Sequence, residues 1–255
     1  MTGKRIRYSR LFGENRNPVV VAVDHGAEFG PTEGVIDLNA ALMQLKNADG
    51  ILINPGMLDI SGDFFAQNGA PHVILRVTWT TAYCFPWNYR ESHTCCVMRP
   101  QDALAAGATF IMACCLLQSG SEKVDRDNVR LFTEIVKEKE LAGIPLIGEL
   151  FPVDAEMMPQ EELHQRIYRG TRILVELGAD AIKTFYTGDR FSEIVEAVPV
   201  PVMALGASKK DSEQDAIDLA KRAVTSGSRG VVFGRNVFQS AEPANFLTKL
   251  KQVVQ

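Results

Sequence analysis

Residues 160–185 read QEELHQRIYRGTRILVELGADAIKTF and contain one complete helix-to-strand unit. The part at 160–177 is amphipathic and long enough for a helix of several turns, and LGADA after it marks a turn. DAIKTF at 180–185 is a short apolar run without strict polar alternation. Such a run is typical of a strand covered on both faces, and therefore of a parallel sheet.

The same unit recurs along the whole chain. Apolar runs occur at 19–24, 50–54, 72–77, 109–114, 144–149, 180–185, 200–205 and 230–234. Helices are predicted at 34–47, 59–68, 100–106, 122–142, 160–177, 190–197, 211–227 and 243–254. Eight strands, each followed by a helix, predict an α/β fold of the (β/α)8 TIM-barrel type, a single domain over 1–255 with 1–17 as an N-terminal leader segment. The alternative is an open doubly wound sheet, but no G-x-G-x-x-G fingerprint follows the first run.

The composition excludes several classes of protein. Of the 255 residues 46% are hydrophobic, the formal net charge is -4, and no dense Lys/Arg cluster supports nucleic-acid binding. No apolar run approaches the ~20 residues that cross a bilayer, and the N-terminus lacks a secretory signal, so we expect a cytoplasmic protein without a membrane partner. The five cysteines lack metal-site spacing, and we expect no metal and no cofactor. Cys114 and Cys115, within FIMACCLL, are expected to be buried.

In such barrels the chemistry is placed at the carboxyl-terminal ends of the strands. Polar residues and glycines stand at these ends. They are Asp24, His25, Asn54, Arg76, Thr78, Gln118, Glu122, Glu149, Lys183, Gly206, Gly234 and Arg235.

Lys183 is unusual because it lies inside an apolar strand, between Ile182 and Thr184. Burying an ammonium group is costly unless it is paired or neutralised, and desolvation lowers the pKa of a lysine. A larger share of neutral amine is what Schiff-base catalysis needs, so Lys183 is the candidate imine-forming residue. In the alternative interpretation, Lys183 is only paired with Asp24 or Glu149 inside the barrel.

Asp24 and His25 follow the first strand in VAVDHG. Asp24 could take a proton from a substrate hydroxyl, or position the carbinolamine hydroxyl that leaves as water. It could also be only a charge partner for Lys183. His25 is a candidate substrate contact, although a histidine after a strand more often forms local hydrogen bonds.

The loops LGASKKD (205–211) and FGRNVFQ (233–239) follow the seventh and eighth strands, where barrels frequently bind phosphate. Glycines allow backbone N–H groups to approach an anion. The predicted phosphate contacts are Gly206, Ala207, Ser208, Lys209, Gly234 and Arg235. Together they indicate a phosphorylated small-molecule substrate.

With these motifs the chain resembles the archaeal-type class I aldolases, often labelled DhnA-type fructose-bisphosphate aldolases, of the DeoC/FbaB-like superfamily. GTRILVELGADAIKTFYTGD (170–189) and GVVFGRNVFQS (230–240) carry the resemblance, VAVDHG also fits, and 55–98 fits poorly. The resemblance implies Lys183 as the imine-forming residue and Asp24 as a catalytic acid or base. It also implies phosphate contacts at Gly206, Gly234 and Arg235, and a homo-oligomer.

Two positions depart from the family pattern. In GELFPVD (148–154), Phe151 stands where the family has a proton-transferring tyrosine, and Glu149, Tyr186 or a water are the candidates to replace it. Ala207 replaces the second of two glycines. A related thiolase that degrades phosphorylated autoinducer-2 also lacks the tyrosine.

The leading hypothesis is therefore an aldehyde-lyase, a class I aldolase that acts on a phosphorylated ketose. The alternatives are thiolase-like acyl transfer on a phosphorylated diketone by the same lysine, and a sugar-phosphate-binding barrel without catalysis. FPWNYRESHTCC (85–96) is interpreted either as part of a substrate lid or as an oligomer contact through Trp87, Tyr89 and Arg90.

Overall fold

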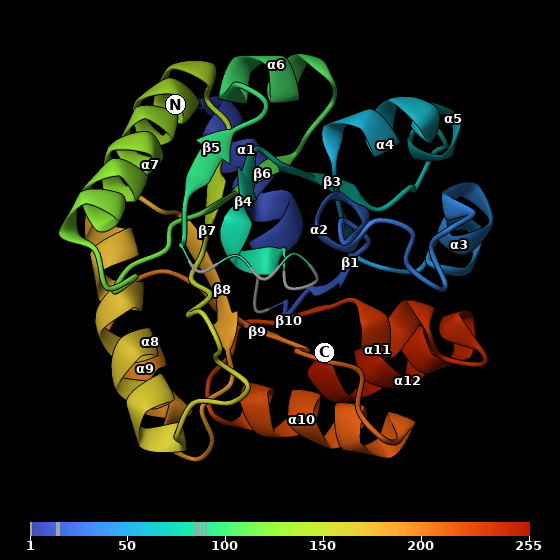
Figure 1. Cartoon of the computed structure of the whole chain (residues 1–255). Helices are drawn as coiled ribbons and strands as arrows, with labels where there is room; N and C mark the ends of the chain where they lie inside the picture. Colours follow the sequence, from blue (N-terminus) through green and yellow to red (C-terminus); the bar gives the residue numbers. More distant parts are fainter. Residues whose placement is uncertain (1, 14–15, 85–86, 88, 90) are drawn as a thin grey trace.

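The computed structural model describes residues 2–13, 16–84, 87, 89 and 91–255. In this part of the chain eight parallel strands close into a barrel in the order β1-β10-β9-β8-β7-β6-β3-β2 (Figure 1). They are β1 (Val19–Ala22), β2 (Gly50–Ile53), β3 (His72–Arg76), β6 (Phe110–Cys114), β7 (Leu146–Glu149), β8 (Ala181–Phe185), β9 (Val202–Leu205) and β10 (Val231–Phe233). Each lies within one of the predicted apolar runs, and the predicted (β/α)8 barrel is confirmed.

Helices surround the strands (Figure 1). They are α3 (Leu38–Gln44), α4 (Pro55–Ile60), α5 (Gly62–Phe65), α6 (Pro100–Ala105), α7 (Glu122–Ala142), α8 (Gln160–Glu176), α9 (Phe191–Glu196), α10 (Glu213–Thr225) and α12 (Pro243–Val254). The helix predicted at 34–47 begins only at Leu38, because the Asp37 side chain accepts a hydrogen bond from Ala40 N and ends the preceding turn. The helix predicted at 59–68 is instead two short helices that meet at Ser61.

Side chains along each strand alternate between two hydrophobic cores. In β1, Val19 and Val21 pack with the surrounding helices, whereas Val20 and Ala22 belong to a cluster inside the barrel. In β8, Ala181 belongs to the same inner cluster, so the side chain two residues further on also points inward. That residue is Lys183. The barrel therefore holds it in the interior, near the carboxyl-terminal end of β8.

Helix α1 (Thr2–Phe12) lies within the segment predicted as a leader and was not predicted as a helix. Its Leu11 and Phe12 join the inner cluster, and the Phe12 ring packs edge-on against Phe110 with centroids 5.7 Å apart. The inner cluster contains Phe110 and Ala181, the first residues of β6 and β8. The helix thus covers the amino-terminal end of the barrel and leaves the other end for the site.

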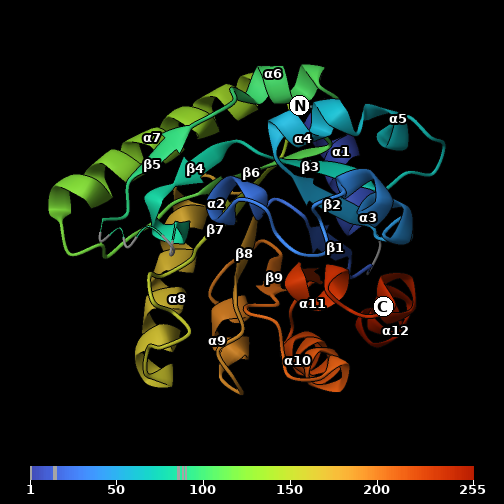
Figure 2. The ribbon, with the colours of Figure 1, turned by 45° about the vertical axis from the view of Figure 1, so that its right-hand side comes forward.

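The carboxyl-terminal end carries additional short elements. Strands β4 (Thr78–Thr80) and β5 (Thr94–Cys96) form an antiparallel hairpin beside α7 (Figure 2). The 3-10 helix η1 (Thr81–Tyr83) and the short helices α2 (Gly26–Phe29) and α11 (Arg235–Phe238) complete this end. The segment 85–96 is only partly described: Trp87 and Tyr89 are exposed, whereas Arg90 lies outside the described residues.

Cys114 and Cys115 are buried, as predicted. Among the described residues, no helix combines the length and the apolar character that a membrane span requires.

Candidate active site

Three charged side chains form a layer inside the barrel at its carboxyl-terminal end. They are Arg76 on β3, Glu149 on β7 and Lys183 on β8, and their exposed fractions are 3%, 1% and 7%. In each of these strands the residue two positions earlier belongs to the inner hydrophobic cluster, so the pleat directs the charged side chain into the barrel. Burial of this kind is tolerated only when the charges are paired.

Each of these buried charges has an ion-pair partner, and the Arg76 guanidinium group contacts two carboxylates. Lys183 Nζ donates a hydrogen bond to Glu149 Oε1 at 2.5 Å, across the register of β7 and β8. Arg76 Nη1 donates to Oε2 of the same carboxylate at 2.7 Å, and Arg76 Nε donates to Asp24 Oδ2. Of the two partners that the sequence suggests for Lys183, the structure therefore gives Glu149 the direct contact and pairs Asp24 with Arg76.

These ion pairs hold two carboxyl groups in the ionised form. Burial alone would raise the pKa of Asp24, but the Arg76 guanidinium and then Lys183 outweigh it, so this pKa lies below its ordinary value. The same balance of burial against Arg76 and Lys183 places the pKa of Glu149 well below its ordinary value. Both groups are therefore proton acceptors and not proton donors near neutral pH.

The His25 side chain lies close to Asp24 and to Gly234, the residue that follows β10. Its Nδ1 is 3.7 Å from Asp24 Oδ1, and burial lowers the pKa of His25 to about 4, so the imidazole is neutral near pH 7. A Cβ atom on Gly234 would collide with the imidazole ring, which explains the glycine at this position. On the other side, Asn54 Nδ2 donates to the backbone oxygen of Asp24 at 2.5 Å. Both neighbours fix the turn after β1.

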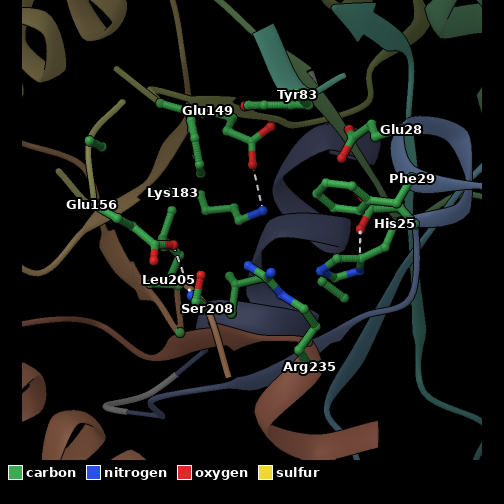
Figure 3. Close-up of a pocket in the computed structure, with 18 of the residues that line it drawn as sticks. His25, Glu28, Phe29, Tyr83, Glu149, Glu156, Lys183, Leu205, Ser208 and Arg235 are labelled. Atoms are coloured by element: carbon green, nitrogen blue, oxygen red, sulfur yellow. Dashed lines mark hydrogen bonds and ion pairs between the residues drawn. The ribbon is translucent and has the colours of Figure 1, made fainter. Parts of the chain in front are cut away.

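A cavity of about 280 Å³ opens above this charged layer (Figure 3). All three predicted catalytic residues line it, together with His25, Gly206, Ala207, Ser208, Gly234 and Arg235. The predicted site residues thus come together from five strands, with one exception. Within the described ranges, no group of three or more His, Cys, Asp or Glu side chains is placed to hold a metal ion.

The exception is Lys209. Its ammonium group donates to the backbone oxygen of Gln239 at 2.8 Å, and its side chain lies outside the cavity. The predicted phosphate contact through Lys209 is therefore not supported. Sequence position places the residue in the loop, but the turn directs its side chain toward the Gln239 carbonyl.

Arg235 supplies the remaining cation at this end of the cavity. Its guanidinium carbon is 5.8 Å from the centroid of the Phe29 ring. Its Nε is buried without a hydrogen-bond partner in the part of the chain that the structure describes. A buried donor of this kind is costly, and an anion in the cavity would satisfy it.

One of the N–H groups predicted to bind phosphate already donates a hydrogen bond to a side chain of the protein. Ser208 N donates to the Glu156 carboxylate at 2.9 Å (Figure 3). The preceding residue, Ala207, has φ 54°, in the left-handed region that favours glycine. The loop therefore presents its N–H groups to an anion, and a carboxylate of the chain occupies that place.

Several other cavity residues, some of them with ionisable side chains, were not predicted as site residues. Glu28 on α2, Tyr83 on η1 and Glu156 in the loop after β7 all line the cavity. Glu28 lies beyond the strand end, in a helix of four residues with no periodic signal. Tyr83 lies in the region 55–98, where the family resemblance is weakest.

A sequence profile of the DeoC/LacD family aldolases matches residues 18–240, a range that includes every strand of the barrel. The chain belongs to the DeoC/LacD aldolase family. The resemblance to class I aldolases that the motifs indicate is thereby confirmed.

Two similar proteins match nearly the whole chain. An uncharacterized aldolase of Saccharolobus solfataricus is 27% identical over 262 residues, covering 100% of this chain and 95% of that protein. The 3-hydroxy-5-phosphonooxypentane-2,4-dione thiolase of Klebsiella pneumoniae is 29% identical over 255 residues, covering 99% of this chain and 81% of its own length. The relatives therefore carry the names of two different reactions.

Solved structures support the fold. An archaeal fructose 1,6-bisphosphate aldolase superposes with a TM-score of 0.81 at 24% identity, covering 98% of each chain. A Schiff-base-forming fructose-1,6-bisphosphate aldolase gives a TM-score of 0.81 at 25% identity, covering 99% of this chain and 100% of that chain.

Proposed function

We propose that this chain is a class I aldolase that cleaves or forms a carbon–carbon bond in a phosphorylated ketose through an imine at Lys183. The single observation that carries the proposal is the buried Lys183 ammonium, held at 2.5 Å by Glu149 on the wall of a 280 Å³ cavity. A lysine at this point can meet a ketone carbon away from bulk water. The family supports the same chemistry.

In the cleavage direction, the Lys183 ammonium passes a proton to Glu149, and the free amine attacks the ketone carbon. The carbinolamine takes this proton back as it loses water, which gives a protonated imine. The adjacent carbon–carbon bond then breaks, and its electrons move toward the imine nitrogen. The hydroxyl proton of the departing fragment passes to the ionised Asp24, and an aldehyde leaves. An enamine remains on Lys183. Protonation of its carbon and hydrolysis of the imine release the ketone product.

The Arg235 end of the cavity favours an anionic group of the substrate. The two inner cations are balanced by two carboxylates, whereas Arg235 has no ion-pair partner among the described residues. Arg235 and the Ser208 N–H would bind the substrate phosphate, which would displace Glu156 from that donor. A phosphate at this end would fix the ketone relative to Lys183.

An activity assay with fructose 1,6-bisphosphate tests the proposal. The wild type should release an aldehyde, and Lys183→Ala should abolish the release because the imine cannot form. Lys221→Ala, which removes an exposed lysine on α10, is the matched control and should keep full activity. Aldehyde release that survives Lys183→Ala would refute the assignment of the lysine.

The second candidate function is acyl transfer from a phosphorylated diketone to coenzyme A, through the same lysine. One observation favours it: residue 151 is Phe, and its ring packs edge-on against Tyr83 with centroids 4.7 Å apart. The cavity thus lacks the tyrosine of the aldolase pattern at this position. Product analysis separates the two reactions, because an aldolase releases a free aldehyde and a thiolase yields an acyl thioester. If the chain binds the substrate but forms neither product and no imine, it is a sugar-phosphate-binding barrel without catalysis.

A further inference from the structure

The cavity contains one carboxyl group that the steps above do not use. Glu28 is only 9% exposed, and its carboxyl group makes no hydrogen bond or ion pair with any residue that the structure describes. Figure 3 shows the Glu28 and Lys183 side chains extending into the same cavity from different elements. Glu28 therefore faces the space in which a substrate bound to Lys183 would lie.

Two hydrogen bonds hold the short helix that carries Glu28. Trp79 Nε1, on the β4–β5 hairpin, donates to the backbone oxygen of Ala27 at 2.9 Å. At the start of the helix, Ala27 N donates to the Asp24 backbone oxygen at 3.3 Å. These two contacts fix the residue immediately before Glu28, so its position does not depend on a partner for its own carboxyl group.

The environment of Glu28 differs from that of the other two inner carboxyl groups. Burial raises the pKa of Glu28 to about 8, and the Arg76 guanidinium, which is engaged by Asp24 and Glu149, only partly opposes this. Asp24 and Glu149 are ionised, whereas Glu28 holds a proton at neutral pH. Carboxyl groups whose environments separate their pKa values in this way divide into bases and acids.

We propose that Glu28 is the acid that protonates the enamine carbon, the step for which Phe151 leaves no tyrosine. This inference rests on the proposed imine chemistry at Lys183. The Glu28 O–H bond breaks and its proton forms the new C–H bond, while the enamine nitrogen lone pair becomes the C=N bond of the protonated imine. Glu28 is left as a carboxylate and regains a proton from water.

Tyr83 is the competing acid, since it also lines the cavity and touches Phe151. Its hydroxyl group is 3.2 Å from the Cys114 sulfur, and burial raises the pKa of Tyr83 well above its ordinary value. A phenol that is already engaged and holds its proton this strongly is a weaker acid than the Glu28 carboxyl group.

The test uses dihydroxyacetone phosphate in deuterated water, with two separate readouts. Borohydride trapping measures the imine at Lys183. Deuterium uptake at the hydroxymethyl carbon measures the reversible step in which the Glu28 carboxylate takes a C–H proton from the imine and the Glu28 acid, after exchange with solvent, returns a deuteron to the enamine carbon. Glu28→Gln should keep the trapping and lose deuterium uptake by about 100-fold or more, the usual contribution of a positioned acid. Glu28→Asp should restore part of the uptake. Glu33→Gln, an exposed glutamate shortly after α2, is the control and should match the wild type.

The outcomes distinguish the two levels of the proposal. No trapped imine in the wild type would overturn the proposed function. Normal trapping with deuterium uptake by Glu28→Gln within a few-fold of the wild type would overturn the role of Glu28 alone. Loss of uptake in Tyr83→Phe with normal uptake in Glu28→Gln would assign the step to Tyr83 instead.

The pH profile of the wild type decides the case if Glu28→Gln does not fold. Uptake begins when the Glu28 carboxylate removes a C–H proton from the imine, so deuterium uptake divided by the trapped imine should rise about tenfold per pH unit up to pH 8 and level off above it. The titratable and charged groups that act on Glu28 or share its cavity are Asp24, His25, Arg76, Tyr83, Cys84, Glu149, Asp154, Glu156, Lys183 and Arg235. Lys183 is the imine in the measured complex. Shifts away from the window of pH 6–9, or above the ordinary value, apply to the pKa values of Asp24, His25, Arg76, Tyr83, Cys84 and Glu149. A profile that is flat from pH 6 to pH 9.5 would overturn the proposal.

Discussion

Lys183 and Glu149 occupy paired positions on adjacent barrel strands, and the lysine Nζ donates to the glutamate Oε1 at 2.5 Å. Arg76 donates to the other oxygen of the same carboxylate. Glu149 therefore orients the proposed nucleophile and balances two buried cations at once. Because Glu149 is ionised, it is a poor candidate to replace the proton-donating tyrosine for which this chain has Phe151.

Glu149→Gln should lower the free energy of unfolding by about 3 kcal/mol, because it leaves buried cations without a counter-charge. Urea denaturation at pH 7 measures the change. Glu162→Gln removes the surface pair with Arg166 and should cost less than about 1 kcal/mol. A loss of stability for Glu149→Gln that is no larger than this control would show that the ion pairs contribute little.

The cost of Glu149→Gln should depend on pH. The pKa of Glu149 is depressed in the folded chain, so its stabilising effect is present above its ordinary value of 4.5 and is lost as the pH falls further. The difference in unfolding free energy between wild type and variant should shrink from pH 6 toward pH 3. A constant difference over this range would contradict the depressed pKa.

Glu28 should produce the opposite dependence. Its folded pKa of about 8 exceeds the ordinary 4.5, so the folded chain keeps a proton that the unfolded chain has lost. The free energy of unfolding of the wild type should fall as the pH rises from 4.5 to 8. Relative to the wild type, that of Glu28→Gln should therefore rise by on the order of 4 kcal/mol by pH 8. Urea denaturation at pH 5, 6.5 and 8 measures the gain, with Glu33→Gln as the control. Parallel curves for all three proteins would refute the elevated pKa.

The Glu156 carboxylate should compete with phosphate for the Ser208 N–H. Removing its charge by Glu156→Gln should strengthen the inhibition by inorganic phosphate about fivefold, since a like charge no longer opposes the anion. Inhibition constants for phosphate measure the effect. Glu161→Gln, which removes a surface partner of Arg190, should leave them unchanged. Weaker inhibition in Glu156→Gln would mean that the residue helps to hold the ligand.

Ala207→Gly should stabilise the chain by about 0.5 kcal/mol. A φ of 54° costs an alanine about 1–2 kcal/mol, and the greater freedom of glycine in the unfolded chain cancels part of the gain. Urea denaturation at pH 7 measures the change. Ala220→Gly, inside α10, should instead destabilise by about 1 kcal/mol. A destabilised Ala207→Gly would show that the loop tolerates alanine without strain.

Much of the barrel could be predicted because parallel strands are buried on both faces and read as apolar runs. Lys183 interrupts such a run and was found for that reason. Arg76 interrupts another apolar run. The two-residue period of a strand directs both side chains into the barrel, so the sequence pattern is sufficient to predict that they lie in one layer.

Other features carried no signal that periodicity could reveal. Helix α1 is mostly polar and buries only Leu11 and Phe12, so its docking depends on the closed barrel. Glu28 lies in a helix too short for a hydrophobic period, and its burial is a tertiary effect of the hairpin packed beside it. The direction of the Lys209 side chain likewise depends on the Gln239 carbonyl from a distant part of the chain.

Reduction of the complex with a phosphorylated ketone shows whether Lys183 forms an imine with the substrate. The protein is incubated with dihydroxyacetone phosphate and borohydride, digested, and analysed by mass spectrometry of its peptides. A stable adduct is expected on Lys183, absent without the ketone and absent in Lys183→Ala. An unmodified Lys183 in the wild type, or an adduct confined to exposed lysines such as Lys221, would contradict this expectation.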